Sequence, residues 1–300
     1  MKRESLNALF AYLTLCIVWG TTYLGIKIAL EGFDPFFMVG VRFLIAGLLM
    51  SPVLLRKRAQ LPADRKEWLA IIVSGICLLV GGNGLVTLSE RYIASGVTAL
   101  TVATNPAWAV LIGGWFFSRE ERYGKIALTG MLLAMAGVVL LHHNRLSVGN
   151  HDLPGVLAAC ASPILWATGS LIARNYIRRT DVLTTTALQM LAATIPVFLI
   201  SLALGESWHV TLTARVVWAM VFLILIGSVL VYAAYVWLTQ HMPISRIVTY
   251  TYINPVVALI LGRIVLGEPI EAHVIPASAL IIGGLLLIYF TRFRKAASRS

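Results

Sequence analysis

The polar residues that could bind a solute lie inside long apolar segments of this sequence. Asparagine and threonine supply hydrogen-bond donors and acceptors, tryptophan and tyrosine add flat rings with one polar atom each, and glycine lets backbone approach a ligand. Together such groups can hold a polar or zwitterionic solute. The alternative is that they bond to neighbouring helices or pack in a core. The predicted substrate-binding residues are Trp19, Thr21, Thr22, Gly82, Asn83, Asn105, Trp108, Trp166, Thr168, Tyr232, Tyr252 and Asn254.

Two Asn-Pro pairs interrupt apolar segments in the two halves of the chain, at Asn105-Pro106 and Asn254-Pro255. Proline has no N–H, and its ring collides with the carbonyl group four residues earlier, so each helix should kink about one turn before the pair. The freed carbonyl groups must face protein or a polar cavity, because lipid offers no donors. Interrupted helices in both halves are typical of transporters with a central site. The predicted kink or gating positions are Pro106, Pro163 and Pro255.

Chemistry that breaks covalent bonds has little support in the sequence. Hydrolysis needs an activated nucleophile or paired carboxylates, and no Asp, Glu or His lies near the middle of an apolar segment. His142, His143 and His151 share one polar loop, which favours solvated surface over a metal site. A phosphate-binding loop is also missing from the sequence. We therefore predict no enzymatic activity, no metal and no cofactor, while carboxylates at segment ends leave proton coupling open.

Arg42 is the most unusual charge within the apolar segments. It lies seven residues into its segment, about 10 Å along a helix that rises ~1.5 Å per residue. One interpretation is that the guanidinium group reaches the membrane interface or pairs with Asp34. The other interpretation is that it contacts the carboxylate of a substrate.

The composition indicates a membrane protein. Of the 300 residues, 59% are hydrophobic and 12% are charged, about half of the ~25% charged residues of soluble domains. Ten windows are apolar and long enough to cross a bilayer, which takes ~20 residues each. The predicted fold class is all-α integral membrane, with ten transmembrane helices at residues 5–30, 35–55, 68–89, 92–118, 126–141, 153–173, 182–204, 216–240, 244–266 and 272–291.

The basic residues predict the orientation of these spans. A net charge of +11 could suggest nucleic acid, but the Lys and Arg residues gather in short loops and tails. With the N-terminus inside, the outer loops hold only Arg91, Arg145 and Arg215. We therefore predict a multi-pass protein of the inner or plasma membrane, with both termini cytoplasmic, the lipid bilayer as partner and no nucleic acid. The first apolar segment is expected to be retained as a span, not removed as a signal peptide.

Landmark residues recur at a nearly constant spacing. The two Asn-Pro pairs are 149 residues apart. Each half then holds five spans. Because five is an odd number, the second half begins on the opposite side of the membrane and crosses it in the opposite sense. We predict two inverted five-helix repeats, residues 1–145 and 146–300, which form one membrane domain. The pairs separated by 147 residues are Trp19 and Trp166, Asp34 and Asp181, and Glu121 and Glu268.

Small residues in the fifth and tenth spans have the spacing of tight helix contacts. Packing of these two spans within one chain is the favoured interpretation, and a homodimer is the alternative. The residues concerned are Gly130, Ala134, Gly137, Ala279 and Gly283.

The chain resembles the drug/metabolite transporter superfamily, in particular its EamA-type members with ten spans. The resemblance covers essentially the whole sequence, and its size and first-span pattern are most similar to YddG-type exporters of aromatic and other amino acids. It implies a basket of helices around a central cavity lined by spans 1, 3, 4, 6, 8 and 9, with spans 5 and 10 at the periphery. The residues that carry it are Trp19-Gly20, both Asn-Pro pairs, Glu121, Gly130, Gly137, Gly267-Glu268 and Gly284.

The halves are not perfectly symmetric, because Ala167 matches Gly20 and Gln189 matches Arg42. The predicted function is export of an amino acid or related small metabolite by alternating access. The export direction follows from the resemblance alone. The alternatives are a drug or nucleotide-sugar carrier, or a channel. A large phosphorylated solute would need several basic residues inside the bundle, and this sequence has few.

Overall fold

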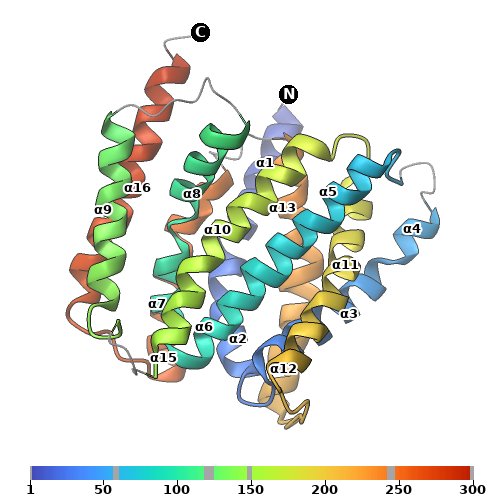
Figure 1. The fold of residues 1–300 in the computed structure, drawn as a ribbon, viewed down its shortest axis with the longest axis horizontal. Helices are drawn as coiled ribbons and strands as arrows, with labels where there is room; N and C mark the ends of the chain where they lie inside the picture. The colour runs from blue at the N-terminus through green and yellow to red at the C-terminus, as the bar shows by residue number, and fades with distance from the viewer. Residues whose placement is uncertain (1, 57–60, 118–124, 147–150, 242–246, 298–300) are drawn as a thin grey trace.

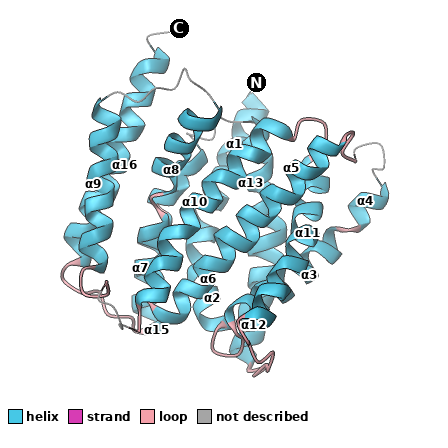
Figure 2. Ribbon diagram, in the orientation of Figure 1, coloured by secondary structure: helices cyan, strands magenta, loops and turns pink. Residues whose placement is uncertain are grey.

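The computed structural model describes residues 2–56, 61–117, 125–146, 151–241 and 247–297. Within these ranges the regular elements are helices, and no strand occurs (Figure 1 and Figure 2). Eight apolar helices have 18 or more residues, and the shorter Ile126–His142 and Val274–Phe290 bring the number to ten. The prediction of an all-α membrane fold with ten spans is therefore confirmed. Glu121, used above to measure the repeat, lies outside the described residues.

Several spans consist of consecutive helical elements rather than one regular helix. In chain order the elements are α1 (Lys2–Thr14), η1 (Leu15–Trp19), α2 (Gly20–Ala29), α3 (Pro35–Met50), α4 (Pro52–Arg56), α5 (Arg65–Gly75), η3 (Ile76–Gly84), α6 (Leu85–Tyr92), α7 (Ser95–Val102), α8 (Asn105–Ile112), η4 (Gly113–Phe117), α9 (Lys125–His142), α10 (Leu153–Tyr176), α11 (Val182–Ala203), α12 (Ala214–Phe222), η6 (Leu223–Leu230), α13 (Val231–His241), η7 (Val248–Tyr252), α15 (Asn254–Leu266) and α16 (Val274–Ala297).

The helices run up and down through one bundle. Both termini lie at the same end, at the top of Figure 1, and we call this the terminal end and the opposite one the distal end. The paired helices α9 and α16 stand side by side at one edge of the bundle (Figure 1). This arrangement agrees with an even number of spans.

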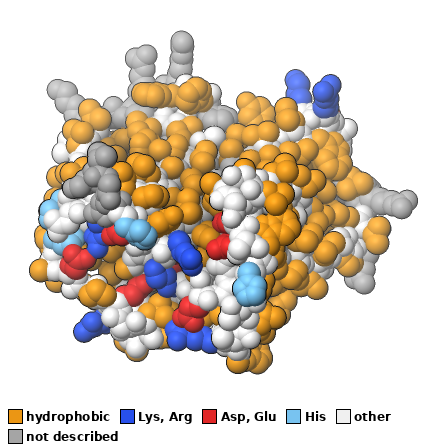
Figure 3. All heavy atoms as spheres, turned by 60° about the horizontal axis from the view of Figure 1, so that its bottom comes forward, with side chains coloured by type: hydrophobic (Ala, Val, Ile, Leu, Met, Phe, Trp, Pro, Cys, Tyr) orange, Lys and Arg blue, Asp and Glu red, His pale blue; other side chains and the backbone are white. Residues whose placement is uncertain are grey.

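Apolar side chains cover much of the outer surface. Leu132, Ile195 and Trp218 are 64%, 69% and 71% exposed, respectively. Charged and histidine side chains gather instead at the distal end, which Figure 3 brings forward. Because a bilayer core accepts apolar surface and rejects charge, this surface suits a bundle that crosses a membrane.

The two Asn-Pro pairs begin new helices, as the missing proline N–H predicts. Helix α7 ends at Val102, and α8 begins with Asn105-Pro106. In the other half, a 3-10 turn over Val248–Tyr252 precedes α15, which begins with Asn254-Pro255. Helix α10 continues through Pro163, so a kink at that residue stays a prediction, as does gating at all three prolines.

Two spans contain π-helical segments at matching positions, η3 and η6, whose first residues are 147 apart. Such segments are frequent at functional sites. In each, a backbone carbonyl accepts a hydrogen bond from a side chain of the other half: Ser162 Oγ donates to Gly82 O at 3.0 Å. The counterpart bond runs from Trp19 Nε1 to Gly227 O at 3.4 Å. The two halves therefore complete each other's backbone bonding.

Two carboxylates accept backbone N–H groups across the halves, one at the start of a helix and one just before a helix whose own N-cap is Asp181, and we call both contacts caps. Glu206 accepts the N–H groups of Phe36 and Phe37, at 2.9 and 2.7 Å, at the distal start of α3. Glu67 accepts those of residues 178–180, at 2.8–3.0 Å, just before the terminal-end start of α11. A negative charge at a helix N-terminus is stabilising. The caps occupy opposite ends of the bundle, as inverted repeats require, while the boundary at residues 145 and 146 stays a prediction.

The small residues of α9 are used inside this chain. A methyl group on Gly130 would collide with the carbonyl oxygen of Gly284 on α16, and one on Gly137 would collide with Ile281. The backbones of α9 and α16 can approach this closely because these positions carry no side chain. The interpretation of intramolecular packing therefore fits the structure.

Candidate functional site

A cavity of about 60 Å³ lies between the spans. It would hold a few water molecules, each of which occupies about 30 Å³ in the liquid, and it is far smaller than ligand pockets of roughly 300–1,000 Å³. The site is therefore too narrow in this form for a ligand of that size. The lining residues are Trp19, Thr22, Tyr23, Ile26, Gly82, Asn83, Val86, Ala99, Val102, Ala103, Asn105, Ser162, Trp166, Tyr250, Thr251 and Asn254.

Many of the predicted binding residues meet at this cavity, although their contact with a substrate stays a prediction. Seven of them line it, from spans 1, 3, 4, 6 and 9. Span 8, which the resemblance also implied, contributes no residue to this lining and packs behind it. The seven are Trp19, Thr22, Gly82, Asn83, Asn105, Trp166 and Asn254.

The other five predicted residues do not line the cavity. Thr21 and Thr168 each donate to the carbonyl four residues earlier in their own helix. The Tyr232 hydroxyl donates to a glutamine on α11, and that of Tyr252 donates to a backbone carbonyl on α16. Trp108 is half-buried on α8. In this form of the protein, these residues bond and pack within the bundle.

Aromatic rings form a cluster on the side of the cavity that faces the terminal end. Trp19 has its ring centroid 5.3 Å from that of Trp166, 5.1 Å from Tyr235 and 5.0 Å from Tyr250. In spans 1, 6 and 9 the ring residue lies nearer the terminal end than the other lining residues. Edge-to-face and tilted contacts of this kind are favourable. We call these four residues the ring layer, and they close the cavity toward the terminal end.

The two asparagines of the Asn-Pro pairs have different neighbours. With its amide nitrogen turned toward them, Asn254 donates to the carbonyl oxygens of Cys16 and Tyr250, at 2.9 and 3.2 Å. These bonds hold backbone next to η1 and η7, where helix geometry changes. Asn105 is 1% exposed, and its amide oxygen has no hydrogen-bond partner among the described residues. Asn105 therefore offers a free acceptor at the cavity wall.

Polar groups lie on the distal side of the cavity, one helical turn beyond three lining residues. Lys27 follows Tyr23 by four residues, and Glu90 follows Val86 by four. Residues four apart lie on the same helix face, so both side chains belong to the face that lines the cavity. Ser95, four residues before the lining Ala99, donates its N–H and hydroxyl to Glu268. We call Lys27, Glu90, Ser95 and Glu268 the distal layer.

Arg42 is buried behind the cavity wall. It is 2% exposed, its Nε donates to Ser228 Oγ at 2.7 Å, and its Nη1 has no hydrogen-bond partner in the described part of the chain. A methyl group on Gly227 would touch both Arg42 and Thr22, which places the guanidinium one layer behind the lining. The pairing with Asp34 is not formed, because Asp34 accepts two hydrogen bonds from Ser207. Contact between Arg42 and a substrate stays a prediction.

Helical spacing could have identified part of the lining that the prediction omitted. Tyr23 and Ile26 follow Trp19 by four and seven residues, so they share its face. Thr251 lies three residues before Asn254. The omitted lining residues are Tyr23, Ile26, Val86, Ala99, Val102, Ala103, Ser162, Tyr250 and Thr251.

A second depression, of about 600 Å³, lies at the terminal end between α10, α11 and α13. It is lined mainly by polar and basic residues, including Arg174, Arg178 and Arg179. None of its lining residues belongs to the central cavity.

Comparison with known proteins identifies the family. The EamA-like transporter family matches residues 6–142 and 153–290. The chain is 30% identical over 295 residues to the uncharacterized inner membrane transporter YedA of Escherichia coli K12, covering 98% of this chain and 94% of that protein. It is 22% identical over 298 residues to a probable amino-acid metabolite efflux pump of Salmonella typhimurium, covering 96% and 97% of the two chains.

A solved crystal structure of another protein shares the fold, with a TM-score of 0.68. It is 21% identical and covers 94% of this chain and 96% of its own. Together with the apolar helices, these matches place the chain in the inner membrane as a multi-pass transporter that is not an enzyme. Because one family matches both halves of the sequence, this protein belongs to the EamA-like transporter family.

Proposed function

We propose that this transporter exports amino acids or related small metabolites by alternating access. One observation supports the proposal most directly: a cavity lined by both polar and apolar groups lies between the ring layer and the distal layer, each on a different side of it. A transporter needs a barrier on each side of its site and must open them in turn. The narrow cavity fits a form in which both layers hold the spans together.

The lining suits a small solute with both polar and apolar parts. The free amide oxygen of Asn105 can accept a hydrogen bond from an ammonium group. Trp19, Trp166 and Tyr250 present ring surface to an apolar or aromatic side chain. None of the sixteen lining residues is charged, which disfavours a nucleotide sugar with its phosphate groups. The name of the Salmonella relative supports an amino-acid metabolite as the substrate.

The interrupted helices supply points where the bundle can bend. Helices α7 and α8 meet at residues 103–104, and η7 meets α15 next to Asn254. Both breaks lie beside lining residues, so bending there widens the cavity and separates one layer at a time. The cavity must widen, since about 60 Å³ does not accommodate an amino acid.

Exchange in liposomes tests the substrate class. Purified protein in liposomes loaded with one unlabelled amino acid should take up the same labelled amino acid faster than protein-free liposomes, with saturation as its concentration rises. Competition by other solutes then ranks the substrates. The proposal of this class fails if none of a complete panel of amino acids gives saturable exchange.

The growth of cells that produce the protein tests the direction of transport. Cells that produce the protein should grow at higher concentrations of a toxic amino-acid analogue than cells that carry the empty vector, because export lowers the internal concentration. The Asn105→Leu variant is the matched control, since it lacks the free acceptor. Greater sensitivity of the producing cells would indicate import.

A further inference from the structure

Glu90 is a buried carboxyl group without a hydrogen-bond partner. It lies on α6, is 0% exposed, and neither of its side-chain oxygens accepts a hydrogen bond within the described residues. Glu67 gives the contrast: it is 4% exposed, and its carboxylate accepts N–H groups from residues 178–180 and from Ala63. The two buried acids therefore differ in whether anything stabilises a negative charge.

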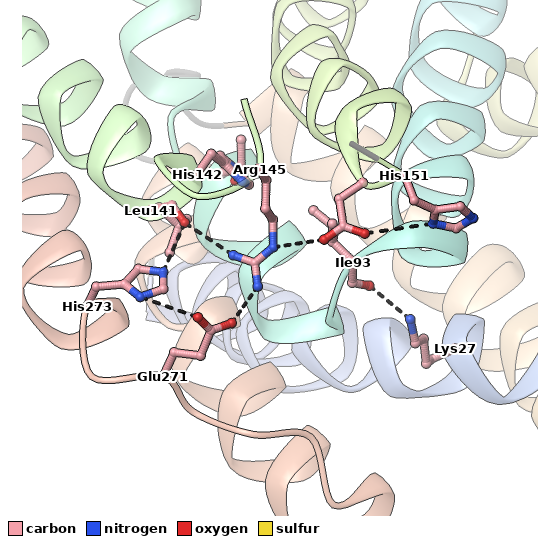
Figure 4. Close-up of polar contacts among 10 residues, drawn as sticks. Lys27, Ile93, Leu141, His142, Arg145, His151, Glu271 and His273 are labelled. Atoms are coloured by element: carbon pink, nitrogen blue, oxygen red, sulfur yellow. Dashed lines mark hydrogen bonds and ion pairs between the residues drawn. The ribbon is translucent and has the colours of Figure 1, made fainter. Parts of the chain in front are cut away.

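The groups around Glu90 do not supply the missing bonds. From α2, Lys27 donates to the backbone carbonyls of Glu90 and Ile93, the latter at 2.9 Å (Figure 4), rather than to the carboxyl group. The carboxylate of Glu268, which follows α15 in the chain, accepts a hydrogen bond from the hydroxyl of Ser95. Arg91 donates to the carbonyl of Leu30 at 3.4 Å. The charges of Lys27 and Glu268 therefore interact with Glu90 electrostatically, without a hydrogen bond to its carboxyl group.

The other elements packed against α6 bring few titratable groups to this point. Tyr23, one turn before Lys27 on α2, is buried nearby. From α7, Thr98 bonds to Ser89 at 2.9 Å. Helix α10 contributes Gly155, α3 contributes Phe36 against Gly84, and η3 continues directly into α6. His151 packs on Tyr92, with ring centroids 5.2 Å apart, and its side chain is 83% exposed.

A buried carboxylate that has lost water and gained no donor is costly. Uptake of one proton removes the charge and with it this cost. Glu90 also lies in the distal layer, one turn from the lining Val86. When that layer opens, water reaches the carboxyl group and can hold its charge. The structure thus links the protonation of Glu90 to the closing of the distal layer.

We propose that Glu90 is a proton-binding site that couples a proton gradient to substrate movement through the cavity. In each cycle the carboxylate takes one proton from a hydronium ion on the distal side: one O–H bond of that ion breaks, an O–H bond forms on Glu90, and a water molecule is left. When the cavity has opened toward the terminal side, water that enters from there reaches Glu90 from the cavity, one turn away; the O–H bond of Glu90 then breaks, and the proton passes to this water. The inference rests on the proposed transport of amino acids, whose energy source it supplies.

Transport and proton movement are measured together in liposomes that contain the wild-type protein. A pH gradient should drive accumulation of the labelled amino acid, and a pH-sensitive dye should report proton movement when substrate is added. In the Glu90→Gln variant, accumulation and proton movement should fall to the level of protein-free liposomes, whereas exchange of one amino acid for itself persists. Glu31→Gln is the matched control, because this acid at the same end is exposed and pairs with Arg215 at 3.3 Å; its coupling should match the wild type.

The outcomes separate the two proposals. Absence of exchange for every amino acid contradicts the proposed function. Saturable exchange without any response to the pH gradient leaves that function standing and overturns the proton site, as does a Glu90→Gln variant that still accumulates substrate.

A labelling experiment on the wild-type protein tests the site even if the variant fails to fold. Dicyclohexylcarbodiimide reacts with protonated carboxyl groups in apolar surroundings, and mass spectrometry locates the product. Glu90 should be labelled, less so as the pH rises, while Glu67 should not be. Lack of labelling at Glu90 across the pH range would overturn the proposal.

Discussion

The amide of Asn254 holds backbone carbonyls of two neighbouring segments, whereas the amide oxygen of Asn105, a residue of the cavity wall, is buried without a partner among the described residues. The first side chain therefore contributes to folding, and the second is available to a solute. The distinction matters because both residues precede a proline at the start of a helix. Substitutions at the two positions should have different effects.

We expect Asn254→Leu to lower the free energy of unfolding by about 2 kcal/mol, because two hydrogen bonds of about 1 kcal/mol each are lost. Asn105→Leu should change stability less and should abolish the rise in Tm that a transported amino acid produces. Thermal unfolding in detergent, with and without the amino acid, measures both effects. Equal losses of stability in the two variants would contradict the assignment.

At these positions the sequence indicated which residues lie together in the bundle better than it indicated what each side chain does. The constant spacing identified Trp19 and Trp166, whose rings indeed touch in the structure. It could not show that Tyr232 and Tyr252 bond to other helices, because the direction of a side chain depends on how helices rotate against one another. For the same reason the buried, unpartnered state of Glu90 could not be predicted from its place at a segment end.

Among the helical elements, α3 takes its N-terminal cap from Glu206 of the opposite half, and the residues just before α11 bond to Glu67 of the opposite half. Glu206 lies 169 to 170 residues from Phe36 and Phe37, and Glu67 lies 111 to 113 residues from residues 178–180. Such caps tie the halves together at both ends of the bundle. Proline chemistry predicted the breaks before α8 and α15, but these long-range caps and the π-helical segments arise only from tertiary contacts.

Glu206→Gln and Glu67→Gln should each lower the free energy of unfolding by about 1.5–3 kcal/mol, the range for hydrogen bonds to a charged group. Glu31→Gln breaks an exposed ion pair at 3.3 Å and should cost less than about 1 kcal/mol. Thermal unfolding of the three variants in the same detergent gives the comparison. If all three variants unfold alike, the caps do not stabilise the fold.

At the scale of the whole molecule, both termini lie at one end, and the basic loops predict that this end is cytoplasmic. Arg65 at the terminal end and His209 at the distal end are both exposed. A single added cysteine at either position therefore reports the side on which it lies. The orientation is still a prediction, since neither the fold nor the comparisons fix it.

We expect His209→Cys to react with a membrane-impermeant maleimide on intact cells whose outer membrane has been opened. Arg65→Cys should react only after the inner membrane is permeabilised. Gel-shift analysis of the labelled protein provides the readout, and the wild-type chain with Cys16, Cys77 and Cys160 gives the background. The reverse pattern of labelling would place both termini outside.

The mutual bonding of the two halves has a consequence for biosynthesis. The ribosome completes residues 1–145 before it makes Ser162, which bonds to Gly82, and Glu206, which caps α3. Until then, the carbonyl of Gly82 and the N–H groups of Phe36 and Phe37 lack these protein partners in the nascent chain. The first five spans therefore have to wait in the membrane, incompletely folded, until at least the sixth and seventh spans have been inserted beside them.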